Sequence, residues 1–342
     1  MARPTIPDLA AAAGVSVATV NRVLAHSARV RPETMQRVLD AARAIGFYGL
    51  ATLQHRVAAA RARHRFGVIV QTPHRAFAHE VARSLEAAAA AVDDAEVQLT
   101  IEPLDDLAPE AVAARMLALG EDNEALAVTA AEHPLVTDAI ERLAARGVPV
   151  LALCSPLSGR TPLGYVGLDN WKVGRMSAWA FDHLCKSPGK LGILVGTHRF
   201  RGHDQNESGF RSYFREHAGE FVLLEPLSTF ESDAIAREMT EKLLRTHRDL
   251  KGLYVSGGGI GGALSALRDG GRAGSVVTVG YDLLPSTRAG LLDGSLTFLI
   301  SHPFRAMAQE TLSALRRMAH ADPAAGGPTV AVPFEIYTRE NI

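Results

Sequence analysis

The chain of 342 residues is poor in several features that often direct a function. It has two cysteines, Cys154 and Cys185, which are too few for a disulfide framework or a cysteine-built metal cluster. No apolar run approaches the roughly 18–20 residues needed to cross a bilayer. The HExxH, CxxC and GxxxxGKS/T patterns are absent. We therefore expect a protein without metal, cofactor, membrane segment or enzymatic activity.

Net charge is also small, since 36 basic and 37 acidic residues leave a formal value of −1. The signs are nevertheless sorted along the chain. Residues 1–65 hold ten arginines and three acidic residues, a formal +7, and the remainder carries −8. A basic head on an acidic body is typical of a DNA-binding module joined to a domain that does not touch DNA.

The basic head begins with the pattern of two short helices. Thr5 is placed to cap the first helix, Gly14 permits a tight turn and Ser16 caps the second helix. The expected buried stripes have helical spacing: Ile6, Leu9, Ala10 and Ala13, then Val20, Val23 and Leu24. The outward face of the second helix is small, polar and basic: Val17, Ala18, Asn21 and Arg22. Such a helix-turn-helix places its second helix in a DNA major groove; the alternative is a hairpin that only packs on the rest of the chain.

A third helix is expected between Pro32, whose fixed φ suits a first helical position, and Gly46, which ends the helix. Its apolar residues share one face: Met35, Val38, Leu39, Ala42 and Ile45. Because the N-terminus is a helix-turn-helix rather than a signal peptide, we expect the protein to stay in the cytoplasm.

From Phe66 onward, short apolar runs alternate with amphipathic stretches, which predicts doubly wound α/β structure with parallel sheets. The expected strands are residues 66–71, 97–101, 125–129, 149–153, 164–168, 190–196, 221–227, 252–256, 275–281 and 295–300. The expected helices are residues 78–92, 108–119, 135–146, 171–184, 208–216, 233–246, 262–268 and 304–319. About ten strands exceed one comfortable open sheet, so we expect two similar lobes with a cleft between them.

The loops at the carboxyl ends of these strands form the predicted ligand site, because ligands of such folds bind there. The loops are residues 73–77, 154–156, 197–201, 257–262, 282 and 301–302. An aromatic ring beside hydrogen-bond donors and one or two acids suits a polyhydroxylated ligand. The alternative for each loop is an ordinary polar connection.

These motifs resemble the LacI/GalR (lactose-repressor) family of bacterial transcription regulators. The head reads TIxDLAxxAGVSxATVxRVL over residues 5–24 and PETxxxVLxAAxxxGF over residues 32–47. Weaker matches follow in order at residues 66–70, 147–150, 166–170, 208–211 and 277–282. The resemblance implies a homodimer, or a tetramer, that binds a palindromic operator through its heads. It also implies a periplasmic-binding-protein-like core that senses a small molecule.

From the resemblance we expect the head to contact double-stranded operator DNA through Thr5, Ser16, Val17, Ala18, Thr19, Asn21, Arg22 and Arg29. Arg22 is the best direct reader of sequence, because a guanidinium can hold guanine by two hydrogen bonds. Val17 and Ala18 offer only apolar contacts, such as to a thymine methyl group. Asn21 stands where the family usually has serine, which points to a different operator preference.

Family members also carry a hinge helix that inserts a leucine into the minor groove. Here residues 49–65 are alanine-rich, basic and compatible with a helix, and Leu53 is the expected wedge. Leu50 and Val57 share that helical face and remain alternatives, as does a solvated linker helix.

The resemblance places an effector in the cleft, where Phe77 and Asp282 fall on positions that the family uses for ligand contact. Cys154 stands where an acid is common and Asn206 where an arginine is common, which points away from an ordinary hexose. Residues 198–203 could bind an anionic sugar acid or sugar phosphate, or form a surface loop. The predicted effector residues are His74, Phe77, Cys154, Arg199, Asn206, Asp282 and Ser301.

A rival hypothesis comes from the glycine-rich run at residues 257–262, which formally satisfies GxGxxG between a strand and a helix. Asp282 follows 20 residues after Gly262, as in a dinucleotide fingerprint. The rival is a nicotinamide-dinucleotide-binding redox sensor or enzyme with a DNA-binding head. Hydrolysis by the core is not favoured, because no nucleophile stands beside a histidine and an acid in a known motif.

We therefore expect a helix-turn-helix head in residues 1–48, a hinge in residues 49–65 and a two-lobed effector-binding core in residues 66–342. One lobe should hold residues 66–166 and 297–325, the other residues 167–296 and 326–342. The predicted function is a sequence-specific transcriptional repressor controlled by a sugar, sugar acid or sugar phosphate. A dimer is favoured over a tetramer because no leucine heptad follows Pro333.

Overall fold

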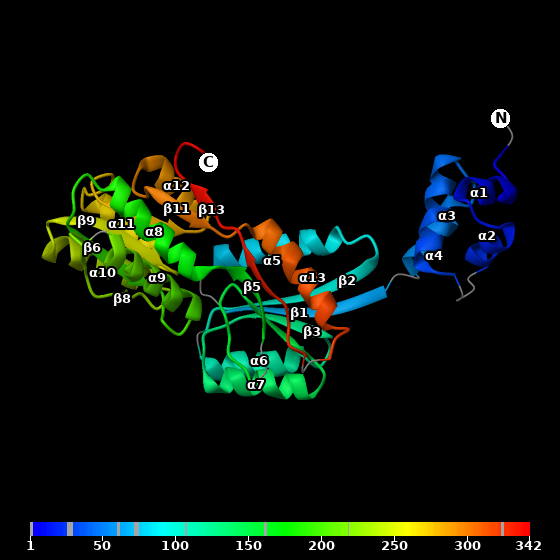
Figure 1. Ribbon diagram of the computed structural model, residues 1–342, viewed down its shortest axis with the longest axis horizontal. Coiled ribbons are helices and arrows are strands. Elements are labelled where there is room, and N and C mark those ends of the chain that lie inside the picture. Colours follow the sequence, from blue (N-terminus) through cyan, green and yellow to red (C-terminus); the bar gives the residue numbers. More distant parts are fainter. Residues whose placement is uncertain are drawn as a thin grey trace. The chain divides into compact units, whose positions relative to one another are not determined.

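The computed structural model describes residues 3–25, 30–59, 62–71, 75–106, 108–160, 163–217, 219–322 and 325–342 (Figure 1). Residue contacts divide the chain into two compact units, one of Met1–His64 with Ala89–Gln98 and one of Arg65–Ala88 with Leu99–Ile342. We call residues 3–59 the head and treat it separately from the core that follows.

The head is helical, as the apolar spacing predicted. Its helices are α1 (Ile6–Ala13), α2 (Val17–Leu24), α3 (Pro32–Ala44) and α4 (Leu50–Ala59). Thr5 and Asp8 form a capping box at the start of α1, and Gly14 follows α1 with a left-handed φ of 61°. The apolar stripes meet in one small core that includes Leu9, Ala10, Val20, Val23, Val38, Leu39, Ala42, Phe47 and Leu53.

The first lobe of the core is built on a six-stranded sheet with the order β12-β5-β4-β3-β1-β2. Its strands are β1 (Ala62–Gln71), β2 (Ala95–Leu104), β3 (Ala125–Thr129), β4 (Val150–Leu153), β5 (Gly164–Leu168) and β12 (Thr329–Val332). The neighbours from β1 to β12 pair in parallel. Its helices are α5 (Arg75–Ala90), α6 (Pro109–Leu119), α7 (Pro134–Ala145) and α13 (Phe304–Met318). In Figure 1, α6 and α7 cover one face of the sheet, and α5 and α13 cover the other.

The second lobe has a seven-stranded sheet, β13-β11-β10-β9-β6-β7 with β8 beside β6. The strands are β6 (Lys190–Val195), β7 (Val222–Leu223), β8 (Leu227–Ser228), β9 (Leu250–Ser256), β10 (Val277–Tyr281), β11 (Phe298–Ser301) and β13 (Glu335–Tyr337). Only β13 is antiparallel among the pairs recorded for the described strands. The helices are α8 (Asn170–Leu184), α9 (Arg201–His217), α10 (Asp233–Thr246), α11 (Ile260–Asp269) and α12 (Pro285–Asp293). The prediction of a helical head and a two-lobed, doubly wound core is confirmed.

The predicted lobe boundaries need correction at the C-terminal end. Strand β11, which we assigned to the first lobe, pairs with β10 in the second lobe. Strand β12, which we assigned to the second lobe, pairs with β5 in the first lobe. The chain therefore changes lobe after β5, after β11 and after β12. A short apolar strand has the same residue pattern in either sheet, so the sequence could not decide this pairing.

Candidate functional site

One cavity of the core lies where strands of both sheets end, and it encloses about 130 Å³. A single water molecule needs roughly 10–15 Å³ of cavity volume measured in this way. The cavity therefore has room for a small organic ligand. It is lined by Gln71, Phe77, Thr129, Cys154, Ser155, Asn170, Phe200, Gly202, His203, Asn206, Glu231, Gly257, Gly258, Ile260, Tyr281, Asp282, Leu284 and His302. Both lobes contribute side chains, as expected for a ligand held at the carboxyl ends of parallel strands.

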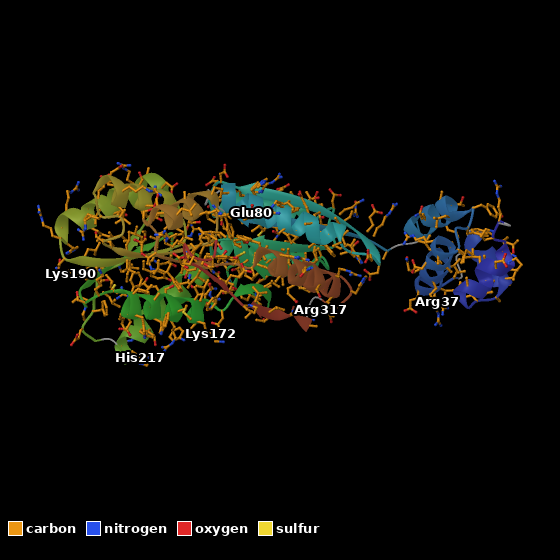
Figure 2. All side chains as sticks on the ribbon, turned by 90° about the horizontal axis from the view of Figure 1, so that it is seen from above. Arg37, Glu80, Lys172, Lys190, His217 and Arg317 are labelled. Carbon is orange, nitrogen blue, oxygen red and sulfur yellow. The ribbon has the colours of Figure 1, made fainter. Side chains whose placement is uncertain are left out.

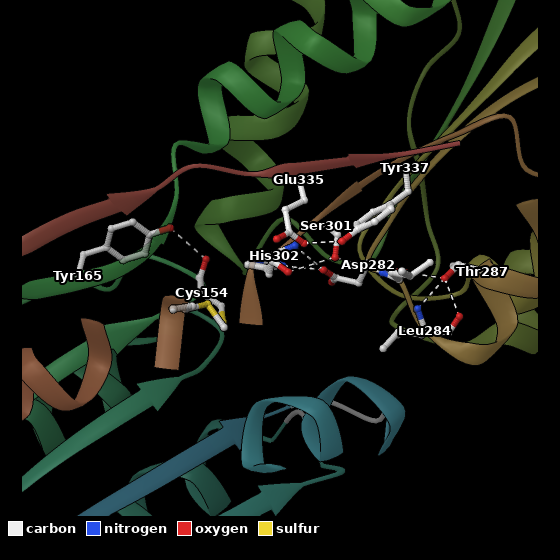
Figure 3. A network of polar contacts seen from close by, with 11 residues as sticks. Cys154, Tyr165, Asp282, Leu284, Thr287, Ser301, His302, Glu335 and Tyr337 are labelled. Atoms are coloured by element: carbon white, nitrogen blue, oxygen red, sulfur yellow. Dashed lines mark hydrogen bonds and ion pairs between the residues drawn. The ribbon is translucent and has the colours of Figure 1, made fainter. Parts of the chain in front are cut away.

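Asp282 occupies one wall, directly after β10 (Figure 3). The residue is buried and has a left-handed φ of 59°. Its Oδ1 atom accepts hydrogen bonds from the His302 backbone N–H at 2.9 Å and from His302 Nδ1 at 2.8 Å. Behind it, Thr287 Oγ1 donates to the Asp282 carbonyl at 2.6 Å. Asp282 is therefore held in one orientation by the chain around it.

An aromatic group lies beside this carboxylate. The ring of Phe77 meets the His302 ring at 5.7 Å in an edge-on arrangement, and it lies 5.7 Å from the Phe304 ring. Phe77 comes from α5 of the first lobe, and His302 follows β11 of the second lobe. An aromatic ring next to a fixed carboxylate can cover the C–H face of a ligand while the carboxylate accepts its hydroxyl protons.

A second buried carboxylate, that of Glu231, lines the same cavity. Its Oε2 atom accepts a hydrogen bond from the Gly258 N–H at 2.8 Å, and its Oε1 atom lies 3.6 Å from His203 Nδ1. Gly196 makes room for it, because a Cβ atom at residue 196 would stand 1.7 Å from Glu231 Oε1. Glu231 also has a left-handed φ, of 61°. The sequence analysis did not identify Glu231.

An amide side chain completes the polar wall. Asn206 on α9 is 3% exposed, and its Nδ2 atom donates to Ser256 Oγ at 3.2 Å. Its Oδ1 atom has no hydrogen-bond partner among the described residues. Buried polar atoms in proteins are nearly always paired, so this acceptor points to a ligand or an ordered water.

Cys154 lies at the end of β4 with a left-handed φ of 62° and lines the cavity. Burial, with a contribution from the Asp282 charge, raises the pKa of its thiol to about 12. Its carbonyl accepts a hydrogen bond from the Tyr165 hydroxyl at 3.2 Å (Figure 3). The thiol therefore stays neutral at physiological pH and acts as a small apolar group.

Backbone strain gathers at this cavity. The described non-glycine residues with positive φ are Cys154, Phe230, Glu231 and Asp282. Three of the four line the cavity. Strained non-glycine residues concentrate at functional sites because the surrounding structure must hold them there. This clustering is an independent indication that the cavity binds a ligand.

Four predicted effector residues reach the cavity wall: Phe77, Cys154, Asn206 and Asp282. Ser301 does not; it is enclosed behind Asp282, where its hydroxyl accepts from the Leu283 N–H at 3.2 Å. Arg199 is also absent from the wall, and its carbonyl accepts from the Glu132 N–H at 2.7 Å. The structure thus places neither residue on this wall, because a strand-end position does not tell which way the side chain turns. His74 lies outside the described residues.

Two backbone amides of the glycine-rich run are occupied by carboxylates of this chain. Helix α11 begins at Ile260, and the Gly258 N–H donates to Glu231. The Gly262 N–H donates to Asp233 Oδ1 at 3.1 Å. A bound pyrophosphate uses N–H groups at the helix start, and two of those groups here donate to Glu231 and Asp233 instead. The glycines also permit close helix packing, since a Cβ at residue 262 would meet the Asp233 carbonyl at 1.7 Å.

The start of α9 joins the two lobes. Arg201 Nη1 donates to Ser158 Oγ at 2.9 Å and lies 3.6 Å from Glu132 Oε1. The next residue, Gly202, donates its N–H to Ser155 Oγ at 3.2 Å. We call these contacts the interlobe latch. They hold the first lobe against α9 at the wall of the cavity.

The second candidate site is the exposed face of α2 in the head. Ser16 caps the helix by accepting from the Thr19 N–H at 3.1 Å. Val17, Ala18, Asn21 and Arg22 are exposed, as the helical pattern predicted. The Arg22 guanidinium folds along the helix, with Nη2 3.4 Å from Thr19 Oγ1. Arg37 on α3 adds a basic side chain to the surface of the head (Figure 2).

The proposed minor-groove wedge is wrong for this conformation. Leu53 has no exposed surface and belongs to the core of the head. A wedge must leave the protein to enter the stacked bases, and Leu53 instead packs within the head. Leu50 is half-buried, while the side chain of Val57 and all of Arg29 lie outside the described part of the chain.

No described helix is both long and apolar enough to cross a membrane. No group of three or more histidine, cysteine or acidic side chains within the described residues could hold a metal ion.

Comparisons with known proteins match two parts of this chain to two families. Residues 66–322 match the family described as "Periplasmic binding protein domain", and residues 5–49 match "Bacterial regulatory proteins, lacI family". A D-ribose/D-allose-binding protein of Pseudomonas aeruginosa is 30% identical over 131 residues, 38% of this chain and 40% of that protein. A xylose/arabinose-binding protein of Sulfolobus acidocaldarius is 28% identical over 145 residues, 40% of this chain and 35% of that protein. The matches thus span less than half of either relative.

Solved structures show the same fold. A solute-binding protein of Agrobacterium vitis with bound α-D-tagatopyranose has a TM-score of 0.73 at 19% identity, covering 81% of this chain and 95% of that chain. A solute-binding protein of Burkholderia graminis in complex with D-arabinose has a TM-score of 0.73 at 21% identity, covering 81% and 96%. Through its core the chain belongs to the periplasmic binding protein domain family, and at residues 5–49 it carries the helix-turn-helix of bacterial regulatory proteins of the lacI family.

Proposed function

We propose that the protein is a transcriptional regulator, a repressor of the LacI/GalR type, whose affinity for operator DNA is set by a sugar or sugar derivative in the core cavity. The observation that carries this proposal is that one chain joins an exposed helix without carboxylates in a lacI-family segment to a cavity between the two lobes of a periplasmic-binding-protein-like core. Such a chain acts in the cytoplasm, where its operator is.

The DNA-binding half of the proposal rests on α2. Its exposed side chains offer two polar base readers, Arg22 and Asn21, and two small apolar contacts, Val17 and Ala18. The hydroxyl groups of Ser16 and Thr19 form a hydrogen bond of 2.9 Å. Both residues lie at the start of α2, where a DNA phosphate would approach. Two heads in a homodimer would bind two half-sites about one helical turn apart. A tetramer would require a further contact between dimers.

The effector half rests on the cavity and on its relatives. The related proteins are named for ribose, allose, xylose and arabinose, and similar folds are recorded with tagatose and arabinose. In this chain the Phe77 ring, the Asp282 carboxylate and the Asn206 amide offer the apolar and polar contacts that a sugar uses.

The interlobe latch suggests how the two halves are coupled. An effector that contacts Phe77 from one lobe and Asp282 from the other favours the arrangement in which Arg201 reaches Glu132 and Ser158. Because a ligand shifts an equilibrium only through its differential affinity, effector binding would change the population of this closed core. The closed core in turn would set the spacing of the two heads on the operator, which raises or lowers DNA affinity.

A selection experiment tests the proposal. Full-length protein is incubated with a randomised duplex library, and bound duplexes are sequenced over several rounds. We expect a palindromic consensus whose half-sites are about one turn apart. Enrichment of no sequence would contradict the proposal.

A further inference from the structure

We infer that the exposed face of α8 is a contact surface for a second copy of this chain, with the two α8 helices antiparallel across a two-fold axis. We call this surface the α8 face, and it consists of Trp171, Lys172, Arg175, Trp179, Asp182 and His183. A contact between copies at this face requires neither DNA nor effector, so it goes beyond the proposed function.

The first step is the exposure of tryptophan. The chain has two tryptophans, and both lie on α8, where Trp171 is 44% exposed and Trp179 is 42% exposed. Tryptophan is usually well buried within a domain, and it is enriched among the residues that dominate binding at protein–protein interfaces. Other residues pack α8 on its own lobe, since Val173, Ala178 and Phe181 have no exposed surface. The two indoles are therefore available to a partner.

The second step is that side chains of the α8 face are already held in place. The Trp179 ring stacks on the His183 ring at a centroid distance of 4.5 Å. The Arg175 guanidinium donates two hydrogen bonds to the Glu216 carboxylate of α9, at 2.9 and 2.8 Å. Ordered side chains lose little conformational entropy when they bind. This surface is therefore suited to a contact with another folded surface.

The third step is charge complementarity, which favours a second copy as the occupant. In an antiparallel pair of identical helices, each position lies opposite the position that is equally far beyond the two-fold axis. With the axis at the level of Ser177, Lys172 faces Asp182 of the second copy, and Asp182 faces its Lys172. Both side chains reach the surface, with exposed fractions of 73% and 28%. Two pairs of opposite charges thus form in one contact.

The same arrangement also matches the aromatic residues. Arg175 lies opposite Trp179 of the second copy, and Trp171 lies opposite its His183. A guanidinium is attracted to the face of an indole ring, and two aromatic rings gain from stacking or edge-on contact. The α8 face is therefore complementary to itself both in charge and in aromatic contacts.

A two-fold contact of this kind sets the size of the assembly. It joins two single chains into a dimer, or, where the chain already pairs through another surface, it joins two dimers into a tetramer. In either case, breaking the contact halves the mass of the assembly.

Sedimentation equilibrium of the full-length protein at several concentrations, without DNA or sugar, tests the inference. Trp171→Lys and Trp179→Lys should each weaken the association by at least about tenfold, as for a tryptophan at the centre of an interface. The mass should then fall to half that of the parent protein at the same concentration. Leu135→Lys is the matched control, because Leu135 lies on α7 and is 40% exposed, and it should leave the mass unchanged. Thermal midpoints show whether each variant remains folded.

A charge exchange tests the antiparallel arrangement. Lys172→Asp and Asp182→Lys each place like charges opposite one another, so each should weaken the association by about fivefold or more. The double variant restores opposite charges and should recover most of the parent affinity. Within one copy the two positions lie about 15 Å apart along the helix, so recovery would come from contact between copies.

Tryptophan fluorescence then locates the contact, because both emitting residues lie on the α8 face. Dilution through the dissociation range should shift the emission to longer wavelength, as the indoles return to water. Trp171→Phe and Trp179→Phe each leave a single tryptophan, and each remaining residue should show the shift.

The outcomes separate this inference from the proposed function. Equal masses for the parent protein and both lysine variants at every concentration overturn the inference, as does an oligomer that dissociates without a change in emission. A double charge variant that stays as weak as the single variants overturns the antiparallel arrangement. An assembly that depends on α8 but selects no DNA sequence leaves the inference standing and removes the proposed function. Operator binding controlled by an effector, with a mass insensitive to α8, does the reverse.

Discussion

Asp282 and His302 form a pair in which one carboxylate oxygen accepts both the backbone N–H and the ring Nδ1 of the same residue, at 2.9 and 2.8 Å. The two residues follow neighbouring parallel strands, β10 and β11. Their pairing therefore ties the cavity wall to the last strand before the chain returns to the first lobe. A ligand that binds Asp282 thus acts on the segment that connects the lobes.

Asp282→Ala should weaken the effector response by about tenfold or more, because the wall loses the carboxylate that accepts ligand donors. DNA binding without effector should be unchanged. The measurement is operator affinity at increasing concentrations of effector. Asp282→Asn is the matched control for the backbone, since asparagine tolerates a left-handed φ and keeps an oxygen for His302. An unaltered dose response in the alanine variant would place the effector elsewhere.

Arg22→Ala should remove sequence preference and leave salt-dependent nonspecific binding. A bidentate contact with guanine contributes roughly 1–3 kcal/mol of discrimination. The measurement compares affinities for the selected operator and a scrambled duplex at several salt concentrations. Arg37→Ala removes the same charge from α3 and serves as the control. The role of Arg22 is refuted if discrimination survives its loss.

Arg201→Ala should weaken effector binding by a few-fold, because it removes one hydrogen bond and one partly exposed ion pair between the lobes. Each contributes about 1 kcal/mol or less in such settings. Titration calorimetry gives the change in Kd. Arg211→Ala breaks a pair within α9 and should have no such effect. Equal losses in the two variants would argue against a latch.

The stability of the core should fall at high pH through Cys154. Burial raises the pKa of this thiol from its ordinary value of 9.0 to about 12. Between these values the unfolded chain has lost a proton that the folded chain retains, so unfolding becomes more favourable as the pH rises. The Cys154 thiol therefore leaves the free energy of unfolding unchanged below pH 9 and lowers it as the pH rises toward 12. Urea unfolding at several pH values measures it.

Cys154→Ala should flatten this pH dependence relative to the parent protein. Cys185→Ala provides the comparison, because its thiol is only half-buried and its pKa is raised to about 11. The Cys185 variant should retain most of the decrease in the free energy of unfolding with rising pH. The pH dependence does not come from Cys154 if both variants lose stability with rising pH as the parent protein does.

The head should be separable from the core. Among the described residues, the apolar cluster of the head is separate from the two core clusters built on β3 and β9. A fragment of residues 62–342 should therefore unfold cooperatively and bind effector as the full chain does. A cut after residue 48 should behave worse, since it removes the partners of Leu53. Loss of cooperative unfolding in the fragment of residues 62–342 would contradict the division into head and core.

Periodic features of the fold were predictable from sequence. The strands at residues 125–129 and 164–168 and the helix at residues 233–246 agree with β3, β5 and α10 at both ends. The two strands are short, largely apolar runs, and the helix is amphipathic with a serine cap before it. Helix α12 was missed because its hydrophobic periodicity is weak. Strands β12 and β13 were missed because they are short and partly exposed.

The cavity was predictable only in part. Phe77 and Asp282 were found through the family resemblance, while Glu231 follows a strand of two residues and is turned inward by a left-handed backbone. Neither feature has a sequence signal, because glutamate rarely adopts that conformation. Arg199 and Ser301 were predicted from their place after a strand, but side-chain direction there depends on tertiary contacts.

The most direct test of the proposed regulation is the affinity of full-length protein for its selected operator, measured by fluorescence anisotropy with and without a bound effector. We expect tight binding to that duplex, weak binding to random competitor, and a change of at least about fivefold in operator Kd when effector is added. Equal affinity for operator and random DNA, or an operator Kd unaffected by a ligand that occupies the cavity, would contradict it.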